Sequence, residues 1–475
     1  MEGEESVSVA YEEALLDGRS GTFTGYQITM KTDTTCIMGQ IVGNYASNIS
    51  SKLLRESGHS VRAKPDDDAG VETNNTRAEK RWICKPHPNF TVLIVFLAVM
   101  IDCMLMTVVE MILDMDLHPN KLISDRFLTL PTHQNNHTIK EDLARKYSLK
   151  VSLLVSLKPG LEMFFNVAVG VLVDRIGYRL PMLIGCLFNL SATLSFAYLR
   201  NYYLLIVARS FQAAGSSLSV IGGLTFLAAT FKDEKSRTIA SSKAFCGISV
   251  GVSGVSGGFA MGSILYQMFG RESPFLVLGL INIIYSTLVI LLVVPRKYTK
   301  PGQGSLKSLL LDKFIVITLL INFVENFTLG VFLGTGPSWM LYTLHGQQWN
   351  IGVILAVASV INVGVQWLTG RYTRPSRHWL FLFLGIAILA IGSLLYPFAT
   401  IVWEVLVPEC ISRIGHGMLV ACANPMLTHL VDIRHNSHYG LVNGLYTATY
   451  NLGQFFLLTD IRTRSVNGWI VKQSR

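Results

Sequence analysis

Residues 90–115 read FTVLIVFLAVMIDCMLMTVVEMILDM, a run in which apolar side chains far outnumber polar ones. About 20 helical residues of this kind span a hydrocarbon core about 30 Å thick. Ten more runs of similar character follow. The runs cover 90–115, 149–173, 180–199, 203–230, 239–263, 274–294, 314–342, 350–370, 379–399, 401–430 and 439–458. The sequence therefore predicts an all-α membrane protein with about eleven transmembrane helices.

The composition supports a bilayer environment over a soluble one. The chain has 475 residues, of which 50% are hydrophobic and 15% are charged, whereas soluble domains carry about 25% charged residues. The formal net charge is +9, but the basic residues are scattered among the connectors and form no stripe that would fit nucleic acid. One polytopic bundle that contacts the lipid bilayer, and no nucleic acid, is the expected organisation.

The basic connectors predict the topology. Lys and Arg gather in alternate connectors, and the positive-inside rule assigns these to the cytosol. The predicted parts are a disordered cytosolic tail (1–88), a six-helix half (90–294) with an exofacial loop (116–148), a cytosolic central loop (295–313), a five-helix half that lacks a twelfth span (314–458) and an atypical tail (459–475). Asn136 heads the triplet Asn-His-Thr in the exofacial loop and is the predicted glycosylation site.

The first span carries an acidic face. Asp102 lies near its centre, and Glu110 and Asp114 fall with it inside an arc of about 120° on a helix. A charge at the membrane centre costs at least about 2.5–3.5 kcal/mol, so this face must point into the bundle or a water-filled cavity. There it would attract an organic cation or protons. Alternatively, Glu110 and Asp114 only mark the wet end of the helix.

Other charges fall within later spans. Lys158 and Glu162 are spaced i, i+4 and can form an ion pair within one helix, either as a neutralised structural pair or as a proton-responsive gate. Arg209 in the fourth span needs a carboxylate or carbonyl partner, since an arginine cannot lose its charge, and the sequence does not identify that partner. Glu325 with Asn326 in the seventh span are candidate contacts for a solute.

Several function classes lack their motifs. No phosphate-binding glycine loop followed by Lys-Ser/Thr occurs, which argues against an ATP-driven pump. The seven cysteines show no CxxC spacing, and no nucleophile–base pair or metal-ligand cluster is evident. We therefore predict neither an enzyme, nor a cofactor, nor a metal site.

Five stretches resemble the vesicular monoamine transporters of the major facilitator superfamily. They are LAVMIDCMLMTVV (97–109), DRIGYRLPM (174–182), VARSFQAAGSSLS (207–219), SPFLVL (273–278) and HLVDIRHNSHYG (429–440). The resemblance covers roughly residues 90–456. It implies a twelve-span rocker-switch carrier that exchanges lumenal protons for cytosolic amines in secretory or synaptic vesicles.

The resemblance also implies roles for particular residues. Asp102 matches the first-span aspartate that recognises the amine, and Lys158 and Arg209 match the basic residues of spans two and four. Lys158 and Arg209, together with Glu162 and Glu110, are the candidate coupling or gating residues. Asp174, Arg175 and Gly177 match the loop between spans two and three that takes part in conformational change.

This chain departs from the family pattern in its last spans. Residue Ala421 or a neighbour stands where the family has an aspartate in span ten, and span eleven has no acid, so the usual partner of Lys158 is absent. We expect spans ten and eleven to offer no acid for coupling, which would then be weak or rerouted through Lys158 and Glu162. The leading prediction is a carrier of a monoamine, followed by a carrier of another cationic solute. A non-transporting scaffold or regulatory paralogue is the alternative, and the sequence leaves the oligomeric state open.

Overall fold

The computed structural model describes residues 88–116, 136–252, 258–293, 306–435 and 438–455. In these ranges the chain forms α-helices and short 3-10 turns, without strands. Residues 1–87 of the predicted N-terminal tail lie outside the described residues, as does the predicted C-terminal tail 459–475. So do residues 117–135 of the predicted exofacial loop.

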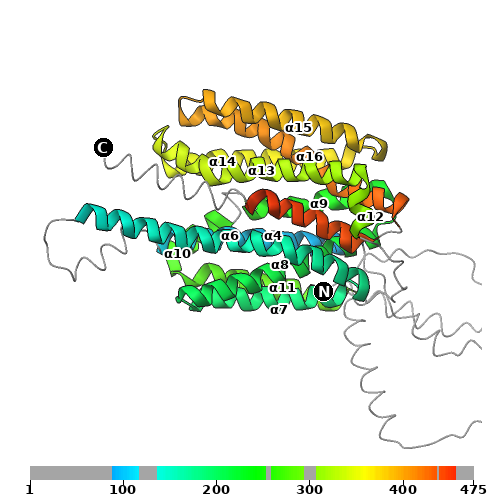
Figure 1. Cartoon of the computed structure of the whole chain (residues 1–475), viewed down its shortest axis with the longest axis horizontal. Coiled ribbons are helices and arrows are strands. Elements are labelled where there is room, and N and C mark those ends of the chain that lie inside the picture. The colour runs from blue at the N-terminus through cyan, green and yellow to red at the C-terminus, as the bar shows by residue number, and fades with distance from the viewer. Residues whose placement is uncertain (1–87, 117–135, 253–257, 294–305, 436–437, 456–475) are drawn as a thin grey trace, which may run out of the picture. The chain divides into compact units, whose positions relative to one another are not determined.

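The helices form two sets that follow each other along the chain (Figure 1). The N-terminal set comprises α4 (Pro88–Asp116), α6 (Asn136–Ile176), α7 (Arg179–Tyr198), α8 (Tyr202–Thr230), α9 (Glu234–Val252), α10 (Gly258–Phe269) and α11 (Glu272–Leu292). The C-terminal set comprises α12 (Leu306–Leu311), α13 (Lys313–Tyr342), α14 (Gln348–Tyr372), α15 (His378–Leu395), α16 (Leu406–Arg434) and a final helix at 439–455, red in Figure 1. The 3-10 turns are η1 (Pro375–Arg377), η2 (Tyr396–Phe398) and η3 (Val402–Val405).

Nine helices of the described part are long and apolar enough to cross a membrane. The fifth predicted span is not among them, because it is described as α9 and α10 with residues 253–257 left out, and α9 begins with the polar run EKSR. The eleventh is not among them because only residues 439–455 of it are described as helix. The other nine predicted spans are helices at nearly the predicted boundaries, except the second, whose helix begins earlier.

Two predicted loops contain helix. α6 begins at Asn136 and not near residue 149, so residues 136–148 of the predicted exofacial loop 116–148 are helical. A search for apolar runs cannot detect this segment, because its sequence NHTIKEDLARKY is polar; its Glu141 and Arg145 have the i, i+4 order that favours a helix. The predicted central loop 295–313 likewise contains the short helix α12.

The two sets of helices meet where α9 packs on α14 and α16 and where α6 packs on the final helix. One buried apolar cluster crosses this boundary, joining Val99 and Phe245 to Leu419 and Tyr446. Gly247 and Gly251 of α9 lie against the backbone of α4, where an added Cβ would come within 2.6 Å of the Phe96 carbonyl oxygen at residue 247. These two glycines of the fifth span therefore serve close packing, as small residues do between membrane helices.

Large apolar side chains are exposed on the outer faces of the helices. Leu187, Val360, Phe383 and Leu394 each expose 66–73% of their surface. Such exposure would be costly in water, whereas lipid tails provide an apolar surrounding. These faces are the expected contact with the bilayer.

Candidate functional site

A buried charge cluster lies in the N-terminal half. The Nζ of Lys158 lies 3.0 Å from Oδ1 of Asp102 and 2.7 Å from Oε1 of Glu162. The hydroxyl of Ser216 on α8 donates a hydrogen bond to Asp102. Three helices, α4, α6 and α8, therefore hold this N-terminal charge cluster together.

Asp102 is the accessible member of the cluster. Its side chain is 18% exposed, against 3% for Lys158 and 4% for Glu162. The i, i+4 pair expected from the sequence forms, but Lys158 does not pair with Glu162 alone. An acid from a second helix completes its coordination, which sequence spacing did not reveal.

Arg209 is fully buried beside this cluster. Its guanidinium donates to the amide oxygen of Gln212 at 2.8 Å and to the carbonyl of Val155 at 3.5 Å. Glu110, Glu162 and Asp102 lie within electrostatic range of it. Together with Arg209 and Glu110, the cluster contains three acids and two bases, so it has one acid more than it has bases. The side chain of Asp114 lies outside the described residues.

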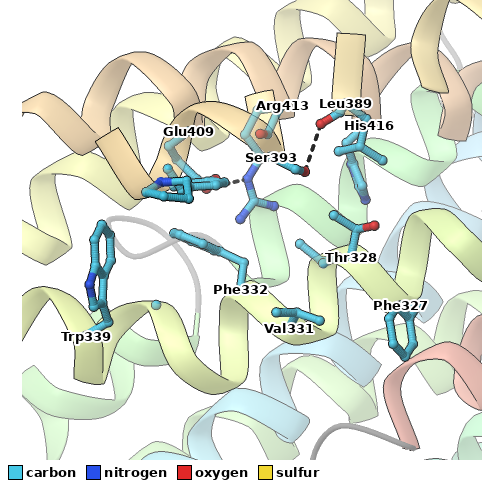
Figure 2. Close-up of a pocket in the computed structure, with 15 residues that line it drawn as sticks. Phe327, Thr328, Val331, Phe332, Trp339, Leu389, Ser393, Glu409, Arg413 and His416 are labelled. Carbon is cyan, nitrogen blue, oxygen red and sulfur yellow. Dashed lines mark hydrogen bonds and ion pairs between the residues drawn. The ribbon is translucent and has the colours of Figure 1, made fainter. Parts of the chain in front are cut away.

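A cavity of about 550 Å³ opens in the C-terminal half. Figure 2 shows side chains of α13, α15 and α16 around it. Glu409 and Arg413 form an ion pair at 2.7 Å on its wall, and the hydroxyl of Tyr396 also donates to Glu409. The rings of Phe332 and Tyr396 stack with centroids 4.9 Å apart. The cavity thus offers aromatic faces beside one buried ion pair.

Span ten does contain a buried acid. Glu409 is 1% exposed within α16, so the expectation that spans ten and eleven offer no acid is wrong for span ten. The resemblance to the family places the acid of span ten at position 421, where this chain has Ala421, which is fully buried. The signal that could have identified the site is the i, i+4 spacing of Glu409 and Arg413.

Glu325 and Asn326 do not line this cavity within the described residues. Glu325 is fully buried on α13 and its Oε1 lies 3.5 Å from Nε2 of His416, which does line the cavity. Asn326 donates to the carbonyl of Asn322 one turn earlier, at 2.8 Å. Sequence reasoning singled out Glu325 but missed His416.

The loop residue Asp174 joins the two halves. Its carboxylate accepts hydrogen bonds from the backbone N–H groups of Gly440, at 2.7 Å, and Leu441, at 2.8 Å. These are the first N–H groups of the final helix, where a carboxylate is favoured by both capping and the helix dipole. A Cβ at residue 440 would come within 2.6 Å of the same carboxylate. Arg175 is exposed, and Gly177 turns the chain with a φ of 86°.

Further polar contacts between the halves lie at the same end of the bundle. Arg237 of α9 pairs with Asp432 of α16 at 2.6 Å, and Glu234 lies 3.2 Å from Nδ1 of His429. Burial raises the pKa of Glu234, an effect that His429 and Arg237 partly offset. We call Asp174 and these four residues the latch. It lies at the end predicted to face the cytosol.

Asp174→Asn should open the latch. An amide can accept one of the two backbone N–H groups but loses the charge, and a hydrogen bond to a charged group contributes about 1.5–3 kcal/mol. The ratio of closed to open molecules should therefore fall about tenfold or more. Spin labels on the exposed positions Lys235 and Arg374, one in each half, would report the distance distribution by electron–electron resonance. Asp233→Asn is the matched control, since the carboxylate of Asp233 accepts hydrogen bonds only from Ser236 of the adjoining α9 among the contacts of the described residues. Equal distance distributions for the two variants would contradict a latch role for Asp174.

Comparison with known proteins places this geometry in a family. The sequence profile of the Major Facilitator Superfamily matches residues 91–457. The chain belongs to the Major Facilitator Superfamily. This confirms the predicted fold class, and the family is one of membrane transporters, not of enzymes.

Comparison with individual relatives shows which members of the family this chain resembles. The chain is 29% identical over 322 residues to the chromaffin granule amine transporter of Rattus norvegicus, covering 67% of this chain and 61% of the relative. It is 30% identical over 308 residues to the synaptic vesicular amine transporter of Bos taurus, covering 64% and 59%. It is 28% identical over 379 residues to the vesicular acetylcholine transporter of Torpedo torpedo, covering 76% and 74%. The chain spans about three fifths of the length of the amine transporters, and the predicted resemblance to vesicular amine transporters is confirmed.

Solved structures show the same fold. The human organic anion transporter MFSD10 matches with a TM-score of 0.60 at 14% identity, covering 81% of this chain and 97% of that one. The proton:xylose symporter XylE matches with a TM-score of 0.59 at 12% identity, covering 82% and 91%. At these identities the likeness concerns the fold alone.

Proposed function

We propose that this protein is a secondary transporter that moves an organic cation, in the first place a monoamine, across a vesicle membrane in exchange for protons. The observation that carries the proposal is the N-terminal charge cluster, which has one acid more than it has bases. Asp102 is its accessible carboxylate and can serve as the counter-charge of an ammonium group. Intramembrane acids of this kind mark solute or proton pathways.

The relatives agree with this assignment. Their names describe transporters of amines and of acetylcholine, which are organic cations or become so on protonation. Because both classes of relative match, a cationic solute other than a monoamine is the second candidate. A scaffold without transport remains the alternative from another class.

Uptake into proteoliposomes tests the proposal. The full chain is reconstituted with an acidic interior and supplied with a panel of labelled monoamines, acetylcholine and an uncharged analogue. A transporter accumulates at least one cation and releases it when the pH gradient is collapsed. A scaffold accumulates none, and protein-free vesicles give the background.

Glu162→Gln should weaken the response of uptake to the pH gradient without abolishing uptake. Neutralising Glu162 leaves Lys158 paired with Asp102 at 3.0 Å, so the lysine is not left unpaired as it would be with Glu162 as its sole partner. The proposed coupling through Lys158 and Glu162 alone is therefore revised to a partial contribution. Initial uptake rates at a series of imposed gradients would measure it, with Glu272→Gln at the exposed start of α11 as control. Complete loss of uptake in Glu162→Gln would contradict this revision.

A further inference from the structure

A chain of polar contacts runs from the core of the C-terminal half to the N-terminal half. It starts at Glu325 on α13, continues through His416 on α16 and Asn362 on α14, and ends at Ser249 on α9. All four residues are buried, with 0–6% of their surface exposed. The last contact, from Asn362 to Ser249, crosses the boundary between the two halves.

The contacts define the tautomer of His416. The Nδ2 of Asn362 donates to the Ser249 hydroxyl at 2.9 Å and lies 3.3 Å from Nδ1 of His416. An amide N–H satisfies this position when Nδ1 is an acceptor, so the ring proton resides on Nε2. Nε2 faces the carboxylate of Glu325 at 3.5 Å.

Glu325 needs a proton or a cation. Among the described residues neither of its carboxylate oxygens has a hydrogen-bond partner, and the nearest basic group is His416. A buried carboxylate without compensation is costly, whereas one proton added to the pair gives either a neutral acid or a carboxylate beside an imidazolium. Since His416 also lines the cavity, protons have a route to the pair.

Other charged groups bear on this pair. Arg413, one turn from His416 on α16, lies within electrostatic range of the imidazole, and Glu409 neutralises Arg413 at 2.7 Å. Tyr446 of the final helix lies within electrostatic range of Glu325. The charged and titratable neighbours of the Glu325–His416 pair are therefore Arg413, which Glu409 neutralises, and the phenol of Tyr446.

We propose that Glu325 and His416 form a proton-binding site of the C-terminal half, and that Asn362 transmits its protonation state to Ser249 of the N-terminal half. The proposal rests on the proton exchange proposed above and assigns residues to it. A proton that enters from the cavity binds Nδ1 of His416, which then becomes a donor. Asn362 must turn its Oδ1, which has no hydrogen bond among the described residues, toward the ring.

This reversal ties the proton to the contact between the halves. Once Oδ1 faces inward, the Ser249 hydroxyl must donate where it previously accepted. Asn362 thus presents a donor to Ser249 in one protonation state and an acceptor in the other, so the free energy of the contact between α9 and α14 depends on the proton, and proton occupancy and the relative position of the halves are thermodynamically linked. An ion pair within one helix provides no such link.

Spin labels at Lys235 and Arg374 test the link by reporting the populations of closed and open molecules across pH. The latch also contains ionisable groups, so the measured quantity is the difference between parent and variant. Between about pH 7.5 and 5.5, the ratio of closed to open molecules should change about fivefold more in the parent than in Glu325→Gln or His416→Gln. A fivefold effect is at the lower end of the range of allosteric coupling. Glu272→Gln should match the parent.

The variant Asn362→Ala distinguishes proton binding at Glu325 and His416 from transmission of the protonation state to Ser249. It should remove the pH-dependent difference in populations, as His416→Gln does, but keep the infrared band of the protonated imidazole ring that His416→Gln removes. If Asn362→Ala fails to fold, the infrared spectra of the parent and His416→Gln still show whether the imidazole ring binds the proton. A parent that shows the pH response but accumulates no amine would refute amine transport and leave this inference standing. One pH profile shared by the parent, Glu325→Gln and His416→Gln would overturn the inference even if amines are carried.

Discussion

Lys158→Met should lower the free energy of unfolding by about 3–5 kcal/mol, the usual cost of breaking a buried ion pair by removing one partner. The side chain of Lys158 is 3% exposed and neutralises Asp102 and Glu162 at once. Methionine has a similar length but leaves the buried carboxylate of Glu162 and the partly buried carboxylate of Asp102 without the cation that they share. Thermal unfolding of the detergent-solubilised full chain would measure the loss.

Two further variants identify the cause. Lys158→Met combined with Glu162→Gln removes one cation and one acid, so it should recover a substantial part of the lost stability. Lys150→Met removes a lysine from an exposed position on α6 and should change stability by less than about 0.5 kcal/mol. If the single and double variants at Lys158 unfold at the same temperature, charge compensation is not what this lysine provides.

The sequence predicts local features of this protein well. The run 180–199 is α7 (Arg179–Tyr198) and the run 203–230 is α8 (Tyr202–Thr230), because apolar length alone determines which segments can span a bilayer. The pairing of Lys158 with Glu162 was also predictable, since residues four apart share one helix face. The polar start of α6 was not, because hydropathy does not register a polar helix.

Contacts between distant residues could not be predicted from one sequence. Asp102 and Lys158 are 56 residues apart, and their contact depends on how α4 and α6 are rotated about their axes. Asn362 and Ser249 are 113 residues apart and meet only because the two halves pack together. Periodicity gives each helix face, but it does not give the neighbour that the face meets.

Glu409 illustrates a different failure. Its position within an apolar run and its spacing to Arg413 were both readable from the sequence. The family pattern led instead to the position of Ala421, where this chain has no acid. The C-terminal half therefore retains buried ionisable groups, at Glu325, Glu409 and His416, on positions that the family pattern does not indicate.

Asp102→Asn should weaken the binding of a cationic amine about tenfold to hundredfold while leaving the protein folded. Asparagine has the same shape, and its oxygen can still accept the hydrogen bond from Ser216. Lys158 keeps Glu162 at 2.7 Å, so no buried lysine is left unpaired. What disappears is the accessible negative charge, and a charged hydrogen bond contributes about 1.5–3 kcal/mol.

Equilibrium binding of a labelled amine to the solubilised full chain measures this loss, with thermal unfolding recorded on the same samples. Glu272→Gln, which removes an exposed acid at the start of α11, should bind like the parent. Glu409→Gln tests the cavity as the competing location of the counter-charge, because it leaves Arg413 uncompensated there and should repel an ammonium group only if the amine occupies that cavity. Unchanged affinity in Asp102→Asn together with a large loss in Glu409→Gln would place the amine in the C-terminal cavity, and Asp102 would then serve only to compensate Lys158.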